Sequence, residues 1–146
     1  MTTDPAPLAA CITRKVRFEE VDALAFVWHG HYPSYFEDAR VALGEIYGLS
    51  YLDFKREGVI APIKSMMMDY VKPMVYGQSY EVEAILHYNE ATRLDFDYTI
   101  RDQEGELVTQ GSSVQLFLDS KNQLLILHPP FYRKICDRWL KGEFGQ

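Results

Sequence analysis

Apolar residues between positions 32 and 48 recur every three or four places, the spacing that puts side chains on one face of an α-helix. This apolar stripe consists of Tyr32, Tyr35, Phe36, Ala39, Leu43, Ile46 and Tyr47. Pro33 suits the first helical turn, where its missing N–H group removes no hydrogen bond, and Gly48 is typical of a helix end. The pattern predicts one long helix over residues 32–48.

Alternation of apolar and polar residues predicts strands on both sides of this helix. The first predicted strand covers residues 11–21, where Ile12 and Val16 are interleaved with charged residues. Residues 61–119 carry four further strands, separated by turn-rich segments such as 102–105. These connections are too short to hold crossover helices, so neighbouring strands are expected to be antiparallel.

Two shorter helices complete the expected secondary structure. Ser50 can cap a helix that ends near Gly58, and a last helix covers about residues 130–141. Residues 1–10 are expected to form a disordered tail, which leaves residues 11–146 as a single domain. The predicted class is α+β, with a five-stranded antiparallel sheet, one long helix and a C-terminal helix.

One helix cannot cover both faces and both edges of such a sheet. Exposed strand edges invite pairing with another chain, and proteins normally cover them. We therefore expect a homo-oligomer in which subunits pair through a sheet edge.

Composition narrows the classes of function. The chain has 146 residues, of which 47% are hydrophobic, enough for one substantial core. Its 15 basic and 21 acidic residues give a net charge of −6, which argues against nucleic-acid binding because phosphate recognition needs Lys and Arg. No apolar run approaches the ~20 residues of a membrane span, and Cys11 and Cys136 have neither disulfide-framework nor metal-ligand spacing. We expect a cytoplasmic protein with two free thiols and no membrane partner.

Asp22 is the carboxylate that suggests chemistry, because it stands where the first predicted strand ends and an apolar loop begins. The N-terminus of the long helix follows about ten residues later, and its free N–H groups carry positive partial charge. A carboxylate beside such groups suits acyl transfer, since the N–H groups stabilise an oxyanion and the carboxylate attacks the carbonyl or activates water. Asp22 could instead simply cap a turn, and from the residues alone that alternative is the more common one.

The residues around Asp22 resemble the signature of hotdog-fold acyl-CoA thioesterases of the 4-hydroxybenzoyl-CoA thioesterase and YbgC type. In that signature a strand ends in Asp, a Gly-containing loop follows, and an aromatic-His (or Tyr)-x-Asn-Tyr stretch leads into a helix carrying Phe-Glu-x-x-Arg. The matching residues in this chain are Asp22, Trp28, His29, Tyr32, Phe36, Glu37 and Arg40. The family's second-strand motif is similar to Met68-Asp69-Tyr70-Val71-Lys72-Pro73 followed by Gly77.

The resemblance extends from about Val16 to about His128, and two positions depart from it. Ala25 stands where the family has Gly, and His31 stands where it has Asn. Alanine tolerates fewer backbone conformations than glycine, and His31 adds an ionisable ring. These changes bear on the shape of the acyl pocket more than on the reaction.

The resemblance implies a hotdog fold, in which the five-stranded antiparallel sheet wraps around the long central helix. It implies hydrolysis of an acyl thioester, either acyl-CoA or acyl-carrier protein, to a free acid and a thiol. Asp22 would be the nucleophile or general base, and backbone N–H groups near His29 and Gly30 would polarise the carbonyl without a metal or organic cofactor. The substrate-binding residues expected on this basis are Trp28, His31, Tyr32, Lys64, Met66 and Met68.

The resemblance also implies an assembly. Related hotdog proteins pair edge to edge into one continuous sheet, with active sites at the interface. A homodimer or homotetramer is therefore expected, in which the segment around residues 63–68 of one subunit contributes to the site of the other.

Two other functions remain open on the same fold. A hotdog dehydratase would carry a catalytic His, a Glu or Asp from the central helix and a Pro-Gly-rich stretch, and this chain lacks that stretch. A non-catalytic acyl-binding module would be expected to lack Asp22. Single residues also have structural alternatives: His29 could only hold the loop, Glu37 and Arg40 could pair at i, i+3, and the methionines could belong to the core.

Overall fold

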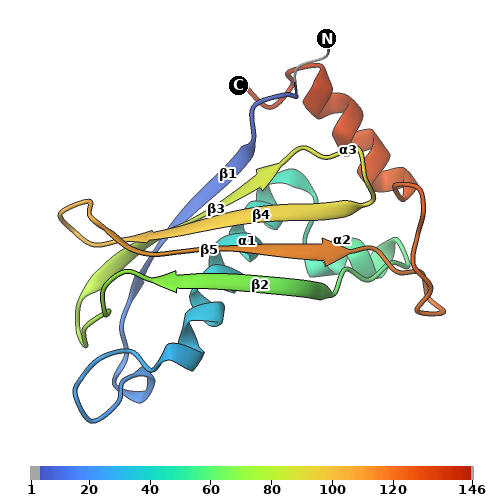
Figure 1. Ribbon diagram of the computed structural model, residues 1–146. Helices are drawn as coiled ribbons and strands as arrows, with labels where there is room; N and C mark the ends of the chain where they lie inside the picture. The colour runs from blue at the N-terminus through green and yellow to red at the C-terminus, as the bar shows by residue number, and fades with distance from the viewer. Residues whose placement is uncertain (1–3, 146) are drawn as a thin grey trace.

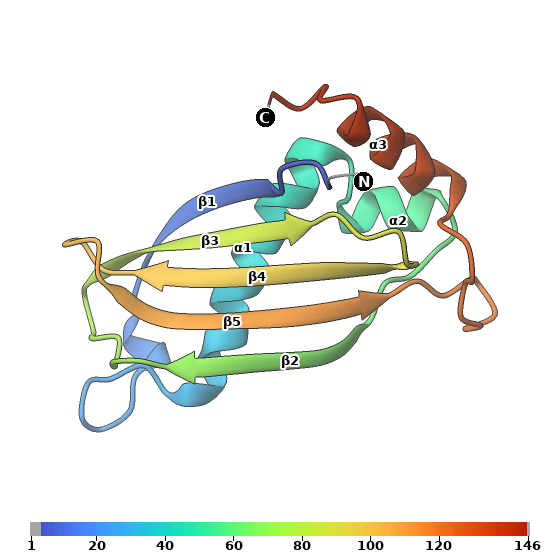
Figure 2. The same ribbon diagram turned by 45° about the horizontal axis from the view of Figure 1, so that its top comes forward.

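A five-stranded antiparallel sheet curves around one long helix in the computed structural model, which describes residues 4–145 (Figure 1 and Figure 2). The strand order across the sheet is β1-β3-β4-β5-β2. The strands are β1 (Leu8–Lys15), β2 (Ile63–Tyr70), β3 (Ser79–His87), β4 (Arg93–Arg101) and β5 (Leu107–Leu116). This is the α+β architecture that the apolar pattern predicts.

The helices begin and end where the sequence signals predict. The three α-helices are α1 (Tyr32–Tyr47), α2 (Tyr51–Arg56) and α3 (Pro130–Leu140). α1 ends at Gly48, whose φ of 82° lies in the left-handed region that glycine adopts freely. α2 begins after Ser50, whose Oγ accepts a hydrogen bond from the Asp53 N–H at 3.1 Å. The C-terminal end of α1 and the N-terminal end of α2 therefore carry the expected caps.

The core lies between α1 and the concave face of the sheet. Alternate residues of β3 and β4 are buried, whereas their neighbours are more exposed. The buried positions are Tyr80, Val82, Ala84, Leu86, Leu94, Phe96, Tyr98 and Ile100. The Phe36 ring of α1 stacks on the Tyr98 ring with centroids 4.5 Å apart, and Gly111 of β5 lies against the same Phe36 ring. These contacts fix the helix over the middle of the sheet.

The N-terminal strand is the element that the sequence pattern misplaces. β1 spans Leu8–Lys15 rather than the predicted residues 11–21. Leu8 is fully buried and pairs with Leu86 of β3, so the inward alternation starts earlier than expected. After β1 the chain turns into a short 3-10 helix, η1 (Phe18–Glu20), instead of continuing as a strand.

The expected disordered tail over residues 1–10 is accordingly wrong for residues 8–10, which belong to β1. The preceding chain is also held, because the Trp139 indole N–H of α3 donates a hydrogen bond to the Ala6 carbonyl at 2.7 Å. Residues 1–3 lie outside the described part of the chain.

β1 and β2 form the two edges of the sheet, and β2 is the more exposed of the two. Every residue of β2 is at least partly accessible, and Met67 is 70% exposed. The register with β5 puts Met66 and Met68 on the opposite face from Met67, the face that carries Gly111 and looks toward α1. β2 therefore offers both an open backbone edge and a row of apolar side chains beneath it.

Cys11 is exposed and Cys136 is buried, and both are free thiols, as predicted. Burial raises the pKa of the Cys136 thiol to about 11, which keeps it protonated at neutral pH. Between residues 4 and 145, no helix is long and apolar enough to cross a lipid bilayer.

We predict that Gly111→Ala lowers the free energy of unfolding by about 1–3 kcal/mol. A β-carbon at this position would lie 2.6 Å from the Met67 carbonyl oxygen and 2.7 Å from the Phe36 ring, and a carbonyl held in the sheet cannot move aside easily. Urea denaturation measures the change, with Ser112→Ala at the neighbouring position as the control. Equal stability of the two variants would contradict the close approach of α1 to β5.

Candidate active site

The segment between β1 and α1 contains a tight turn that opens at Asp22. The Asp22 N–H donates to the Phe26 carbonyl at 2.8 Å, and the Ala25 N–H donates to the Asp22 carbonyl at 3.0 Å. The Tyr76 N–H, from the chain that follows β2, donates to the Ala25 carbonyl at 2.9 Å. The turn is therefore closed within itself and also docked on a distant segment.

Ala25 has a φ of 65°, in the left-handed region. A residue with a β-carbon adopts this region at a cost of roughly 1 kcal/mol, whereas glycine adopts it freely. The turn thus keeps the backbone conformation that a glycine at this position would favour, even though the chain carries alanine.

The Asp22 carboxylate both caps this turn and faces solvent. Its Oδ1 accepts hydrogen bonds from the Leu24 N–H at 2.9 Å and from the Phe26 N–H at 3.3 Å, so the turn-capping alternative is correct for one oxygen. Within residues 4–145, its Oδ2 accepts no hydrogen bond. One oxygen fixes the carboxylate while the other is free to take a proton or to attack.

Asp22 lines a groove of about 340 Å³. The groove lies where the N-terminal end of α1 and the end of β2 come together, and Figure 2 shows the course of these two elements. Its walls come from two segments far apart in the sequence, the loop before α1 and the chain that leaves β2. Besides Asp22, the lining includes Trp28, His29, Tyr32, Tyr70 and Lys72. The structure therefore brings four of the predicted catalytic and substrate-binding residues, Asp22, Trp28, His29 and Tyr32, to one groove.

The other predicted binding residues do not line this groove. Met66 and Met68 are half-buried on the α1 side of β2, and Lys64 is exposed where the register of β2 shifts. The His31 ring lies edge-on against Trp28, with centroids 5.5 Å apart. None of these residues forms a wall of the groove.

A second 3-10 helix, η2 (His29–His31), leads directly into α1. The N–H groups of His29 and Gly30 open this turn, so they have no carbonyl partner within it. The Trp28 indole lies close against Gly30, where a β-carbon would come within 2.1 Å of the ring. The Tyr70 hydroxyl donates a hydrogen bond to the His29 carbonyl at 3.0 Å. These two contacts hold the turn.

Glu20 anchors the loop at its start. Its carboxylate is buried, pairs with Arg14 of β1, and accepts hydrogen bonds from the Tyr35 hydroxyl of α1 and from the Arg17 N–H, each at 2.9 Å. Its backbone carbonyl accepts the Trp28 N–H at 2.9 Å. One residue thus ties β1, α1 and both ends of the loop together.

The charge state of this anchor follows from its contacts. Burial alone would raise the pKa of the Glu20 carboxyl, because the charged form loses hydration. The hydrogen bonds from the Arg17 N–H, from Arg14 and from Tyr35 outweigh burial and hold that pKa below its ordinary value of 4.5. Burial, and then the hydrogen bond to Glu20, raises the pKa of the Tyr35 hydroxyl. The pair is a carboxylate and a neutral phenol at neutral pH.

A second polar cluster links α1 to α2 and the sheet. Arg40 pairs with Glu37 at 3.8 Å, which confirms the pairing expected from their spacing. Arg40 also donates to the Tyr51 hydroxyl at 2.9 Å and to the Tyr98 hydroxyl at 3.4 Å. Arg40 lies about two helical turns beyond the groove, so these residues hold the helices in place and do not reach Asp22.

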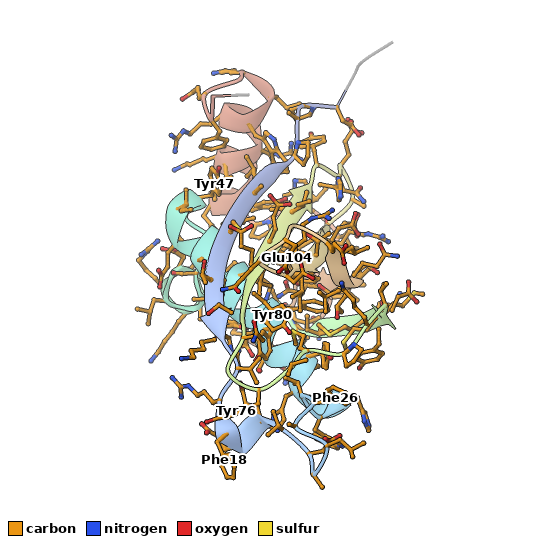
Figure 3. All side chains as sticks on the ribbon, turned by 90° about the vertical axis from the view of Figure 1, so that its left-hand side faces the viewer. Phe18, Phe26, Tyr47, Tyr76, Tyr80 and Glu104 are labelled. Carbon is orange, nitrogen blue, oxygen red and sulfur yellow. The ribbon has the colours of Figure 1, made fainter. Side chains whose placement is uncertain are left out.

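Aromatic rings are exposed at the end of the molecule that carries the loop. Phe18, Phe26 and Tyr76 lie together there (Figure 3), and Phe18 meets Tyr76 edge to face with centroids 6.0 Å apart. Phe18 is 76% exposed. The surface next to the groove is therefore apolar, as the composition of the loop suggests.

Comparison with known proteins decides the family. The family model described as the thioesterase-like superfamily matches residues 16–136 of the chain. This protein belongs to that superfamily. A relative from Bacillus subtilis (strain 168), named "Putative acyl-CoA thioesterase YneP", is 27% identical over 125 residues, which cover 86% of this chain and 88% of the relative.

Solved structures show the same fold as this thioesterase-like protein. The DHNA-CoA thioesterase from Staphylococcus aureus superposes with a TM-score of 0.81 at 23% identity, over 93% of each chain. The hypothetical protein TT1821 from Thermus thermophilus gives a TM-score of 0.77 at 28% identity, over 86% of this chain and 96% of its own. The predicted hotdog fold and family resemblance are confirmed.

The contacts that Glu20 and Tyr70 make in this thioesterase-like protein could not be predicted from the sequence. Glu20 is one of several charged residues between positions 14 and 20, and no spacing marks it as buried. Tyr70 lies in a recognised motif, yet its partner His29 is 41 residues away in the chain. The alternation along β2 was the available signal, since it puts Tyr70 on the face that looks toward α1.

We predict that Glu20→Gln lowers the free energy of unfolding of this thioesterase-like protein by about 2 kcal/mol near neutral pH, the scale of a buried hydrogen bond to a charge. The lowered pKa means that folding favours the ionised carboxylate. This stabilisation is therefore complete well above pH 4.5 and is lost as the pH falls below that value. Urea denaturation measures the free energy of unfolding across this pH range. The difference between wild type and variant should shrink as the pH falls.

Glu19→Gln is the matched control, because Glu19 is the neighbouring carboxylate and its side chain is 68% exposed. Glu19→Gln should change the free energy of unfolding by less than about 0.5 kcal/mol, both near neutral pH and in acid. If the loss of unfolding free energy in Glu20→Gln did not depend on pH, the charge of Glu20 would not be what holds the loop.

Proposed function

We propose that this protein hydrolyses acyl-CoA thioesters to a free acid and coenzyme A. The observation that carries the proposal is that Asp22, with one unengaged carboxylate oxygen, shares a groove with His29, which opens a turn whose N–H groups have no partner within it. These are the two elements that acyl transfer requires, a base or nucleophile and a polariser of the carbonyl. The name of the Bacillus subtilis relative supports coenzyme A as the carrier.

In the proposed reaction the thioester oxygen accepts hydrogen bonds from the N–H groups of His29 and Gly30, where the positive ends of η2 and α1 favour developing negative charge. The free oxygen of Asp22 takes a proton from water, whose oxygen bonds to the carbonyl carbon. Collapse of the tetrahedral intermediate breaks the C–S bond, and the proton on Asp22 passes to the leaving thiolate. In the alternative route Asp22 itself attacks the carbonyl carbon and expels the thiolate, and water then hydrolyses the mixed anhydride.

The neighbouring side chains suggest how the acyl group is held. Trp28 and Tyr32 line the groove beside Asp22, and we propose that they contact the acyl group close to the carbonyl. Met66 and Met68 lie farther back along β2, on the side facing α1. Their flexible thioether side chains would meet a longer acyl chain.

We predict that Asp22→Asn keeps the fold and lowers kcat for acyl-CoA hydrolysis on the order of 10² to 10⁴-fold. The Asn side-chain oxygen still accepts from the Leu24 and Phe26 N–H groups, so the turn is kept while the base is lost. A panel of acyl-CoA and acyl-carrier-protein thioesters, followed with a thiol reagent, measures the activity and identifies the carrier.

Asp97→Asn is the matched control, since Asp97 is an exposed carboxylate of β4 that pairs with His87 and lies outside the groove. It should retain wild-type activity. If Asp22→Asn retained most of its activity, Asp22 would not be the reacting carboxylate.

We also propose that two subunits pair through β2. Every residue of this edge strand is at least partly accessible, and Tyr70 at its end lines the groove, so a partner at the edge would lie beside the site. Light scattering coupled to size exclusion at micromolar concentration should give at least twice the chain mass of 16.9 kDa. A stable monomer with full hydrolase activity would refute this assembly.

A further inference from the structure

We infer that Tyr70 is a positioning residue for hydrolysis, whose hydroxyl holds the η2 turn so that the N–H groups of His29 and Gly30 face the thioester oxygen. The inference rests on the proposed function and adds a residue to it. Its starting point is the 3.0 Å hydrogen bond from the Tyr70 hydroxyl to the His29 carbonyl. The Met68 sulfur, 3.6 Å from the same hydroxyl, is the weaker acceptor.

The hydrogen bond acts on the peptide that belongs to the turn. The His29 carbonyl and the Gly30 N–H are parts of one planar trans peptide, so fixing the direction of the carbonyl fixes that of the N–H. The His29 N–H is separated from this peptide only by the two backbone torsions of its own residue. Hydrogen bonds in series also polarise one another, so a donor at the carbonyl strengthens the adjacent N–H as a donor.

Tyr70 itself is held firmly enough to serve this role. It is the last residue of β2, and the N–H groups of Val71 and Lys72 directly after it both donate to the Val108 carbonyl, at 2.9 and 3.0 Å. Its ring meets the Tyr32 ring edge to face, with centroids 4.7 Å apart. Tyr32 is the first residue of α1 and is buried. The end of the open edge strand is thereby joined to the start of the helix.

Among the side chains of the described residues, no other donor supports the turn at the His29 carbonyl. Trp28 also packs against Gly30, but this apolar contact limits the distance between the two residues and does not set the direction of a peptide. Between residues 4 and 145, Tyr70 is the one residue whose side chain donates a hydrogen bond to the His29 carbonyl. Loss of this hydroxyl should therefore leave the turn in place but less sharply oriented.

Tyr70→Phe removes only the hydroxyl, because the packing of the ring on Tyr32 is unchanged. We expect kcat for acyl-CoA hydrolysis to fall about fivefold to tenfold, the effect of one hydrogen bond, while KM stays within about twofold. A rise in KM with kcat unchanged would mean that the hydroxyl binds substrate, and it would overturn the positioning role.

Tyr76→Phe is the matched control. Tyr76 is a nearby half-exposed tyrosine that packs on Phe18, and its hydroxyl makes no hydrogen bond within the described residues. Its substitution should leave kcat, KM and the thermal midpoint at wild-type values. An equal loss of kcat in both variants would overturn the inference.

A spectroscopic measurement tests the contact without relying on activity. His29-Gly30 is the only His-Gly pair in the sequence, so protein labelled with ¹³C at His carbonyls and ¹⁵N at Gly gives a single cross-peak in an amide–carbonyl correlation experiment. This peak reports both the carbonyl that Tyr70 contacts and the adjacent N–H. Tyr70→Phe should move the carbonyl resonance upfield and shift the Gly30 amide, whereas Tyr76→Phe should leave both in place.

The two measurements separate the possible failures. An unmoved cross-peak in Tyr70→Phe, with wild-type protein active, overturns the inference and leaves the proposed function standing. The opposite result is that the cross-peak moves in Tyr70→Phe but wild-type protein hydrolyses no acyl-CoA or acyl-carrier-protein thioester. That result overturns the proposed function, and with it any role for Tyr70 in hydrolysis.

Discussion

The buried pairing of Glu20 with Arg14 and Tyr35 is the contact on which the geometry of the site depends. It joins the chain after β1 to the first turns of α1, and the Arg14 guanidinium lies 3.7 Å over the Tyr35 ring. A buried carboxylate persists only where its charge is paired and its hydrogen bonds are made. The loop that carries Asp22 therefore starts from a fixed point, and β1 and α1 cannot shift past each other without leaving that charge unpaired.

The candidate site lies at the N-terminal end of α1, away from the other two helices. α2 and α3 lie at one end of the molecule, and the loop lies at the other (Figure 1). The entry to α1 thus brings unpaired N–H groups to an accessible groove, and the end of β2 supplies the facing wall. The chemistry and the open edge of the sheet meet in one region, which links the proposed activity to the proposed pairing of subunits.

Much of this architecture can be predicted from the sequence, because burial of one face imposes a regular spacing on α1, β3 and β4. The first strand could not be bounded in this way. Its alternation continues by chance through Phe18, which the structure leaves exposed, while the Arg17 N–H turns back onto Glu20 and ends the extended chain. The spacing of apolar and polar residues also does not indicate which residues far apart in the sequence contact each other. The Asp22 loop could be located from its motif, but the contacts by which Glu20 and Tyr70 hold it are visible only in the folded structure.

The left-handed conformation of Ala25 has a consequence for how a ligand would be received. Three backbone hydrogen bonds, two within the turn and one from Tyr76, keep Ala25 in this conformation, which an alanine without such bonds disfavours. The loop has therefore lost its conformational freedom during folding, before any acyl group enters the groove. Binding need not order a mobile lid, so more of the contact free energy remains to discriminate one acyl group from another.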